Sequence, residues 1–138
     1  MVYADTSVLL ALFLNEPKTS DAWRWVSQQQ AGSIAASDWT LTEFSSALAV
    51  KVRMKVIDAD THKKTLFAVK RFTLNQLVLI QPEKADFHRA AIFCDSWQMG
   101  LRAADALHLA IAERHGMAVC ALDKIIDRSH APASLPLS

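Results

Sequence analysis

Four acidic residues stand where the sequence changes from one kind of pattern to another. Asp5 follows the apolar run Val-Tyr-Ala, and Asp123 follows Ala-Val-Cys-Ala-Leu, so both end expected strands. Glu43 and Asp105 lie near the starts of expected helices. In right-handed βαβ units, the carboxyl ends of strands and the amino ends of helices share one edge of the sheet. We therefore expect the four carboxylates to meet in one crevice.

Such a cluster has a specific chemistry. Carboxylates about 4 Å apart repel one another by roughly 1–4 kcal/mol per pair, so they must raise their pKa values or bind cations. No set of His or Cys ligands accompanies them in the sequence, and an all-oxygen set suits Mg²⁺ or Mn²⁺ rather than zinc. Carboxylate-held divalent cations commonly orient a phosphodiester and activate water. The pattern thus predicts a metal-dependent phosphodiesterase.

Asp105 is the acid that is hardest to explain as an ordinary solvent-exposed residue. Its expected neighbours on the helix are apolar or aromatic, with Leu101, His108 and Leu109 one turn away. Stabilisation of a helix start by the macrodipole is the alternative explanation. His108 itself is a candidate general base, but its place on an apolar face favours a packed, hydrogen-bonded core histidine.

The other three acids have competing structural explanations. Thr40 and Glu43 have the spacing of a capping box, which explains Glu43 equally well. Asp5 has the position of a residue that caps the next helix, and Asp-Lys at Asp123 is ordinary turn chemistry.

Strand and helix patterns alternate along the chain. Expected strands cover 2–4, 33–37, 77–80, 117–122 and 133–135, and expected helices cover 8–14, 19–32, 38–56, 58–72, 86–97 and 101–115, with Thr6 and Ser7 capping the first and Gly116 ending the last. This order predicts one α/β domain over residues 1–138, a three-layer α/β/α fold with a central parallel sheet of four to five strands. The long helical stretch between the second and third strands predicts a protruding helical hairpin.

Composition sets further bounds. The chain has 138 residues, 51% of them hydrophobic, which suffices for one domain with a real core. Its longest apolar run is too short to span a bilayer and no basic segment precedes it, so we expect no membrane association or secretory signal. Cys94 and Cys120 fit no metal-finger spacing and are expected as free thiols in a reducing cytoplasm.

The charge distribution is uneven. The net charge is only +1, yet the segment from Lys51 to Arg71 carries seven basic residues against two acidic ones. A solvated helix face and a phosphate-binding surface explain this excess equally well.

The residues also carry a resemblance. The opening Asp5-Thr6-Ser7, the segment Thr42-Glu43-Phe44, the run Ala104-Asp105-Ala106-Leu107-His108-Leu109-Ala110 and the closing Leu122-Asp123-Lys124 resemble the motifs of PIN-domain ribonucleases. Length and pattern are similar to the VapC toxins of type II toxin–antitoxin pairs. The resemblance covers nearly the whole chain, and the segment around Asp105 is its most specific part.

The resemblance implies a PIN-like endoribonuclease in which Asp5, Glu43, Asp105 and Asp123 hold one or two Mg²⁺ or Mn²⁺ ions. Similar toxins are homodimers, cut structured RNA, often transfer RNA, and are silenced by a VapB antitoxin whose C-terminal segment lies in the acidic groove. Supporting roles fall to Thr6 and Ser7 near the metal-bound water or a neighbouring carboxylate, and to Arg102 near a phosphate.

The chain departs from the family pattern at its end. Ala121 stands where the family usually has Thr or Ser, which removes a hydroxyl near the fourth acid. Asp127 is a nearby acid that offers an alternative to Asp123, and the usual helix and Gly before the last strand are not evident.

Other functional classes fit less well. A phosphoacceptor receiver needs an acidic pair at the first strand, where Asp5 stands alone, and a dehalogenase-like phosphatase needs Asp or Thr where Ser7 stands. A catalytically degenerate PIN module that binds RNA or protein without cutting remains the main alternative.

Overall fold

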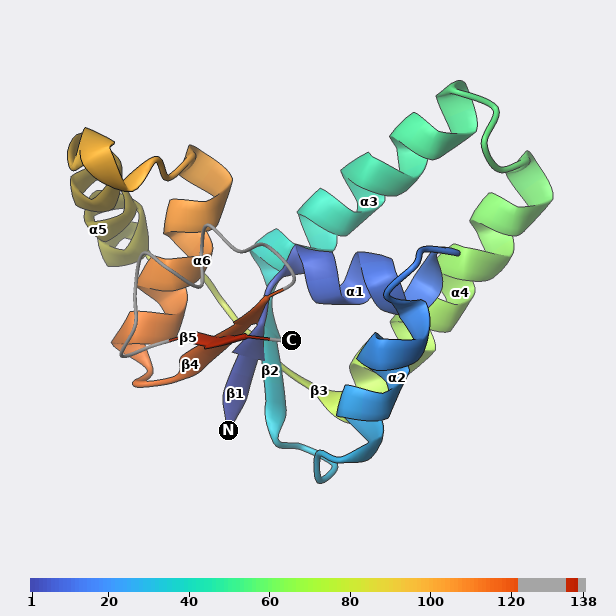
Figure 1. Ribbon diagram of the computed structural model, residues 1–138, viewed down its shortest axis with the longest axis horizontal. Coiled ribbons are helices and arrows are strands. Elements are labelled where there is room, and N and C mark those ends of the chain that lie inside the picture. The colour runs from blue at the N-terminus through green and yellow to red at the C-terminus, as the bar shows by residue number, and fades with distance from the viewer. Residues whose placement is uncertain (122–133, 137–138) are drawn as a thin grey trace.

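A five-stranded parallel sheet forms the centre of the computed structural model, which describes residues 1–121 and 134–136 (Figure 1). Its strands are β1 (Val2–Ala4), β2 (Ile34–Ser37), β3 (Leu77–Ile80), β4 (Ala118–Ala121) and β5 (Ser134–Pro136), in the order β3-β2-β1-β4-β5. Every strand pair is parallel. The predicted α/β class with a parallel sheet of four to five strands is therefore confirmed.

Helices cover both faces of the sheet. They are α1 (Thr6–Phe13), α2 (Thr19–Ser27), α3 (Asp38–Arg53), α4 (Ala59–Gln76), α5 (Lys84–Asp95) and α6 (Ala103–Arg114), with a short 3₁₀ turn, η1 (Trp97–Met99), after α5. One apolar core joins the sheet to α1, α2, α3 and α4, and a second joins it to α5 and α6. The side chains of β1 alternate between them, because Val2 and Ala4 belong to the first core and Tyr3 to the second.

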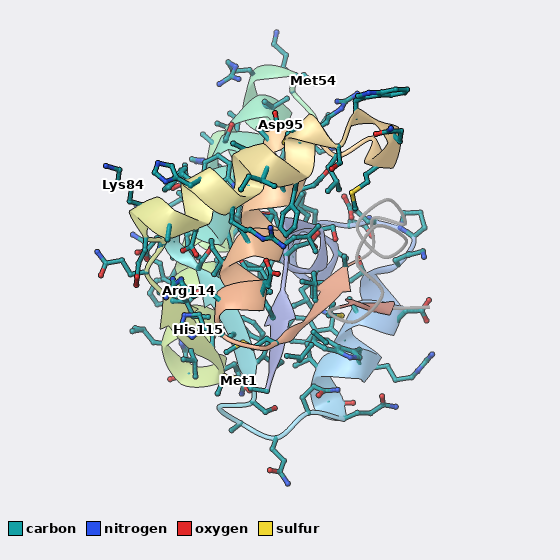
Figure 2. All side chains as sticks on the ribbon, turned by 90° about the vertical axis from the view of Figure 1, so that its left-hand side faces the viewer. Met1, Met54, Lys84, Asp95, Arg114 and His115 are labelled. Atoms are coloured by element: carbon teal, nitrogen blue, oxygen red, sulfur yellow. The ribbon has the colours of Figure 1, made fainter. Side chains whose placement is uncertain are left out.

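The α3 and α4 helices form a hairpin that stands out from the sheet, as the sequence predicted (Figure 1). Its tip contains Met54, which lies at the opposite end of the molecule from Met1 at the start of β1 (Figure 2). Since β1 runs away from Met1, the hairpin extends on the side of the sheet where the strands end.

Several element boundaries differ from the sequence prediction because other residues cap the helices. The N-cap of α1 is Asp5, not Thr6 or Ser7, and its side chain accepts a hydrogen bond from the Ser7 backbone. Helix α2 ends at Ser27, well before Gly32. Arg102 is the N-cap of α6, so Leu101 precedes the helix and is not on its face.

One ion-paired cluster joins α5 to α6. Asp86 is 1% exposed, and Arg114 donates to both of its carboxylate oxygens, from Nε at 2.7 Å and Nη2 at 2.9 Å. Burial alone would raise the pKa of Asp86, but the bonds from Arg114 and the Glu83 backbone lower it overall. This cluster fixes the two helices on that face of the sheet. No helix among the described residues has the length and apolar character needed to cross a membrane.

Candidate active site

Asp5 lies at the carboxyl end of β1, where the chain turns into α1. It is 3% exposed, and its Oδ1 accepts hydrogen bonds from the Ser7 backbone at 3.0 Å and the Ser7 hydroxyl at 2.5 Å. Burial raises the pKa of Asp5 to about 6, against the opposing influence of His108 and of these bonds. The Asp5 carboxylate is thus held in place by Ser7, but its hydrogen bonds do not offset the cost of burying its negative charge.

Asp105 further disfavours the ionised form of Asp5. It lies in the first turn of α6 and is partly exposed, and its negative charge contributes to the raised pKa of Asp5. The structure therefore brings together two of the predicted acids that are 100 residues apart in the sequence.

Glu43 lies in the second turn of α3 and is bound by residues from two other helices. Thr6 of α1 donates from its hydroxyl to Glu43 Oε1 at 2.5 Å, and the Nε2 atom of His108 on α6 lies 2.5 Å from the same oxygen. Burial alone would raise the pKa of Glu43, but these hydrogen bonds lower it overall. Glu43 is held as an ionised carboxylate at the same edge of the sheet.

The capping box between Thr40 and Glu43, the alternative explanation for Glu43, is not formed. The cap of α3 is formed by Ser37 and Thr40, whose side chains and backbone N–H groups bond reciprocally. The helix begins at Asp38, as the sequence predicted, but its N-cap is Ser37. Glu43 then falls outside the cap, which leaves its carboxylate to the site.

A buried polar network runs from Glu43 into the core. His108 is 2% exposed, and its Nδ1 lies 2.6 Å from the Tyr3 hydroxyl. That hydroxyl lies 2.8 Å from Ser37 Oγ and 3.3 Å from Thr40 Oγ1. Tyr3, Ser37 and Thr40 are each fully buried. None of these three residues was predicted from the sequence to support the site; a tyrosine inside an otherwise small and apolar strand was the available signal.

The donors in the network follow from its chemistry. Glu43 accepts only, and Thr6 has given its proton to Glu43, so the shared neighbour Nε2 of His108 must carry a hydrogen. In a neutral ring, Nδ1 then accepts from the Tyr3 hydroxyl, whose pKa is raised above its ordinary value by burial. His108 is therefore the packed, hydrogen-bonded histidine that was expected, with a direct link to the site.

The remaining residues that the sequence singled out lie outside the described range or at the starts of α3 and α6. Asp123, its alternative Asp127 and the neighbouring Lys124 lie outside the described residues. Arg102 is exposed at the start of α6, one turn before Asp105. Trp39, which follows the start of α3, packs against the core on the α6 side.

The donor chemistry of this edge fits a hard divalent cation. Both hydrogen bonds that Ser7 donates to Asp5 reach Oδ1, and among residues 1–121 the structure records no hydrogen bond to Oδ2. Asp105 adds negative charge beside it, which a cation would offset. Within those same residues, no three His, Cys, Asp or Glu side chains form a complete metal-binding group.

Comparison with known proteins identifies the fold. The family model of the PIN domain matches residues 2–130. The chain belongs to the PIN domain family. This assignment removes the receiver and phosphatase alternatives. A search of curated protein sequences finds no match.

Solved structures agree with the PIN assignment. The chain is similar to VapC20 of Mycobacterium tuberculosis, a sarcin–ricin-loop-cleaving toxin, with 16% identity, a TM-score of 0.72, and 98% and 97% of the two chains covered. It is similar to a toxin–antitoxin complex from Klebsiella pneumoniae, with 17% identity, a TM-score of 0.70, and 100% and 98% covered. The FitAcB structure from Neisseria gonorrhoeae gives 15% identity, a TM-score of 0.74, and 100% and 97% covered.

Proposed function

We propose that this PIN domain is a metal-dependent endoribonuclease that hydrolyses phosphodiester bonds in transfer RNA or another structured RNA. The observation that carries the proposal is the pairing of Asp5 and Asp105 at the open edge of the sheet, with the pKa of Asp5 raised to about 6. A buried carboxylate beside another acid is typical of a site that functions with a cation. The sarcin–ricin-loop cleavage named for VapC20 supports an RNA substrate.

In this proposal the carboxylates bind the metal, and neighbouring side chains orient them. Asp5, Glu43 and Asp105, with Asp123 as the fourth ligand, would hold Mg²⁺ or Mn²⁺. The bound metal supplies polarisation of the phosphodiester and activation of water. Ser7 orients the Asp5 carboxylate through Oδ1, while Thr6 and His108 orient Glu43 through Oε1. Arg102, exposed at the N-cap of α6, would contact a phosphate of the RNA in this proposal.

The biological role that we propose is that of a toxin restrained by a VapB-like antitoxin, acting in the cytoplasm as a homodimer. Structural neighbours that are toxin–antitoxin complexes support this role. An apolar pocket of about 360 Å³ between α3 and α4 adds support, because Phe44 and Ser45, which follow Glu43, are part of its lining. An apolar groove of this kind fits the apolar face of a bound peptide helix.

The test is cleavage of total RNA and transfer RNA by the purified protein with Mg²⁺, with Mn²⁺ and with chelator. We expect discrete fragments that require metal and that an Asp5→Asn variant does not produce. An Asp95→Asn variant is the control, since Asp95 is an exposed acid at the end of α5. A folded wild type that binds RNA but never cuts it would favour the degenerate, RNA-binding alternative.

A further inference from the structure

The outer face of α4 carries an exposed aromatic ring between basic residues. Lys63, Phe67 and Arg71 are four residues apart, so they lie along one side of the helix. Phe67 is 63% exposed, and the Arg71 guanidinium carbon lies 5.9 Å from the centre of its ring. Val69 and Phe72, by contrast, are buried in the core beneath the helix. We call Lys63, Lys64, Phe67 and Arg71 the α4 outer face.

Folding does not account for this face. An exposed phenylalanine gains little from burial, and Phe67 is not among the residues that form or pack against either apolar core. Lys64 forms an ion pair with Asp60, and no other cation of the 51–71 segment forms one within the described part of the chain. In the same part of the chain, Arg24, Arg89 and Arg114 are each paired with a carboxylate. The hairpin therefore carries unneutralised positive charge.

The acidic site creates a need for such a surface. A cluster of carboxylates repels a polyanion, so an RNA that reaches it must be held by positive charge elsewhere. Seven of the basic residues lie between Lys51 and Arg71, on the hairpin that extends on the strand-end side of the sheet (Figures 1 and 2). The hairpin that carries this charge starts at the edge of the sheet where the site lies, since α3 follows the end of β2.

We propose that the α4 outer face binds the RNA substrate, with Lys63, Lys64 and Arg71 on phosphates and the Phe67 ring stacked on an unpaired base. This inference rests on the proposed ribonuclease function. A basic surface that also presents an aromatic ring is typical of single-stranded nucleic-acid binding. The face differs from the apolar pocket between α3 and α4, because Phe67 and Arg71 are not part of the pocket lining. A protein partner is the competing occupant, and the charge favours RNA.

The experiment measures binding of fluorescently labelled transfer RNA by anisotropy in chelator, so that the RNA is bound but not cut. The test variants are Phe67→Leu, which keeps an apolar side chain but removes the ring, and Lys63→Ala/Arg71→Ala. The control is Lys18→Ala/Lys84→Ala, which removes the same charge from exposed positions on other elements. Circular dichroism and size-exclusion chromatography establish that each variant folds and keeps the oligomeric state of the wild type.

We expect Phe67→Leu to weaken binding by about five-fold or more, the loss of one stacked base. Lys63→Ala/Arg71→Ala should lower the slope of log affinity against log salt by about 1.4 to 1.8, the loss of two phosphate contacts. The control should match the wild type in both. If the wild type binds and cuts RNA and the test variants bind it equally well, the α4 outer face is not the RNA surface, although the ribonuclease proposal stands.

Two further outcomes also overturn the inference. If Phe67→Leu turns an oligomer into a monomer, or abolishes binding of the purified antitoxin while RNA binding is kept, the face is a protein interface. If the wild type neither binds nor cuts RNA, the ribonuclease proposal itself fails, and this inference fails with it.

Discussion

His108 Nε2 lies 2.5 Å from Glu43 Oε1, although the two residues are 65 positions apart. The contact joins α6, on one face of the sheet, to α3, on the other, at the edge where Asp5 ends β1. A buried histidine that bonds a carboxylate through one nitrogen and a tyrosine through the other fixes where that carboxylate points. This relationship makes His108 a positioning residue for Glu43.

Replacing His108 should therefore change metal binding. His108→Ala leaves Glu43 bonded only to Thr6 and is expected to weaken Mn²⁺ binding by about 10- to 100-fold, the usual cost of losing such an outer partner. His108→Gln keeps an N–H that can reach Glu43 and should restore part of the affinity. Electron paramagnetic resonance titration with Mn²⁺ measures this directly. Equal Mn²⁺ affinity in the wild type and His108→Ala would refute the positioning role.

Asp105→Asn should weaken both the stabilisation of the fold by metal and the cleavage of RNA. Mg²⁺ or Mn²⁺ is expected to raise the melting temperature of the wild type, because a ligand that binds only the folded state stabilises it. Most of that rise should disappear in Asp105→Asn, and RNA cleavage should fall by at least about 100-fold, or about 3 kcal/mol. Thermal melts with and without metal measure the first effect. Asp95→Asn serves as the control, and an unchanged metal response in Asp105→Asn would count against the site.

The metal-free protein should lose stability as the pH rises from about 4 to about 6. Asp5 has a pKa of about 6 in the fold against an ordinary value of 3.8, so in this range the folded state binds more protons than the unfolded one. A shift of this size corresponds to about 3 kcal/mol, present below pH 4 and lost above pH 6. Urea denaturation in chelator across this range measures it.

Asp5→Asn supplies the matched comparison for the pH effect. Its amide oxygen still accepts from the Ser7 backbone, but position 5 no longer titrates. We expect the variant to lack this part of the pH dependence and, without metal, to be more stable than the wild type near pH 7. A wild type whose stability does not fall between pH 4 and 6 relative to Asp5→Asn would contradict the burial argument.

The Asp86–Arg114 pair should matter for stability and not for chemistry. Asp86→Ala removes two charge-assisted hydrogen bonds from Arg114, which keeps Glu83 as a partner, and is expected to cost about 2–3 kcal/mol of unfolding free energy. The exposed pair Arg89–Glu113 is the control, since solvent screens it and disrupting it with Glu113→Ala should cost much less. Equal losses in the two variants would show that burial does not set the strength of the Asp86 pair.

The sequence predicted the sheet, the layers and the hairpin because these depend on the order of apolar and polar segments. Helix starts were harder, because several adjacent residues can cap. Asp5, Thr6 and Ser7 are all good caps, and the backbone geometry chooses Asp5. At α3, Ser37 and Thr40 form the capping box together, so Glu43 is not part of the cap that its spacing from Thr40 suggested.

For the candidate site, the sequence pointed to individual acids and to His108, but not to the polar network behind them. Charged residues in apolar surroundings marked Asp5 and Asp105, and His108 was expected in the core. Nothing in the spacing of Tyr3, Ser37 and Thr40 indicates that Ser37 and Thr40 meet at the Tyr3 hydroxyl, which in turn contacts His108. Their contacts span up to 105 positions and depend on how β1 and β2 pair with their neighbours. Such long-range polar contacts follow from tertiary packing rather than from local patterns.

The buried network has a consequence for how this sequence can change over time. Tyr3, Ser37, Thr40 and His108 share their hydrogen bonds, so replacing any of them removes a partner from another buried polar atom of the network. A single substitution at any of these positions is therefore costly, while a paired substitution can be neutral. Among relatives of this chain, we expect positions 3, 37, 40 and 108 to vary together, as one inherited unit.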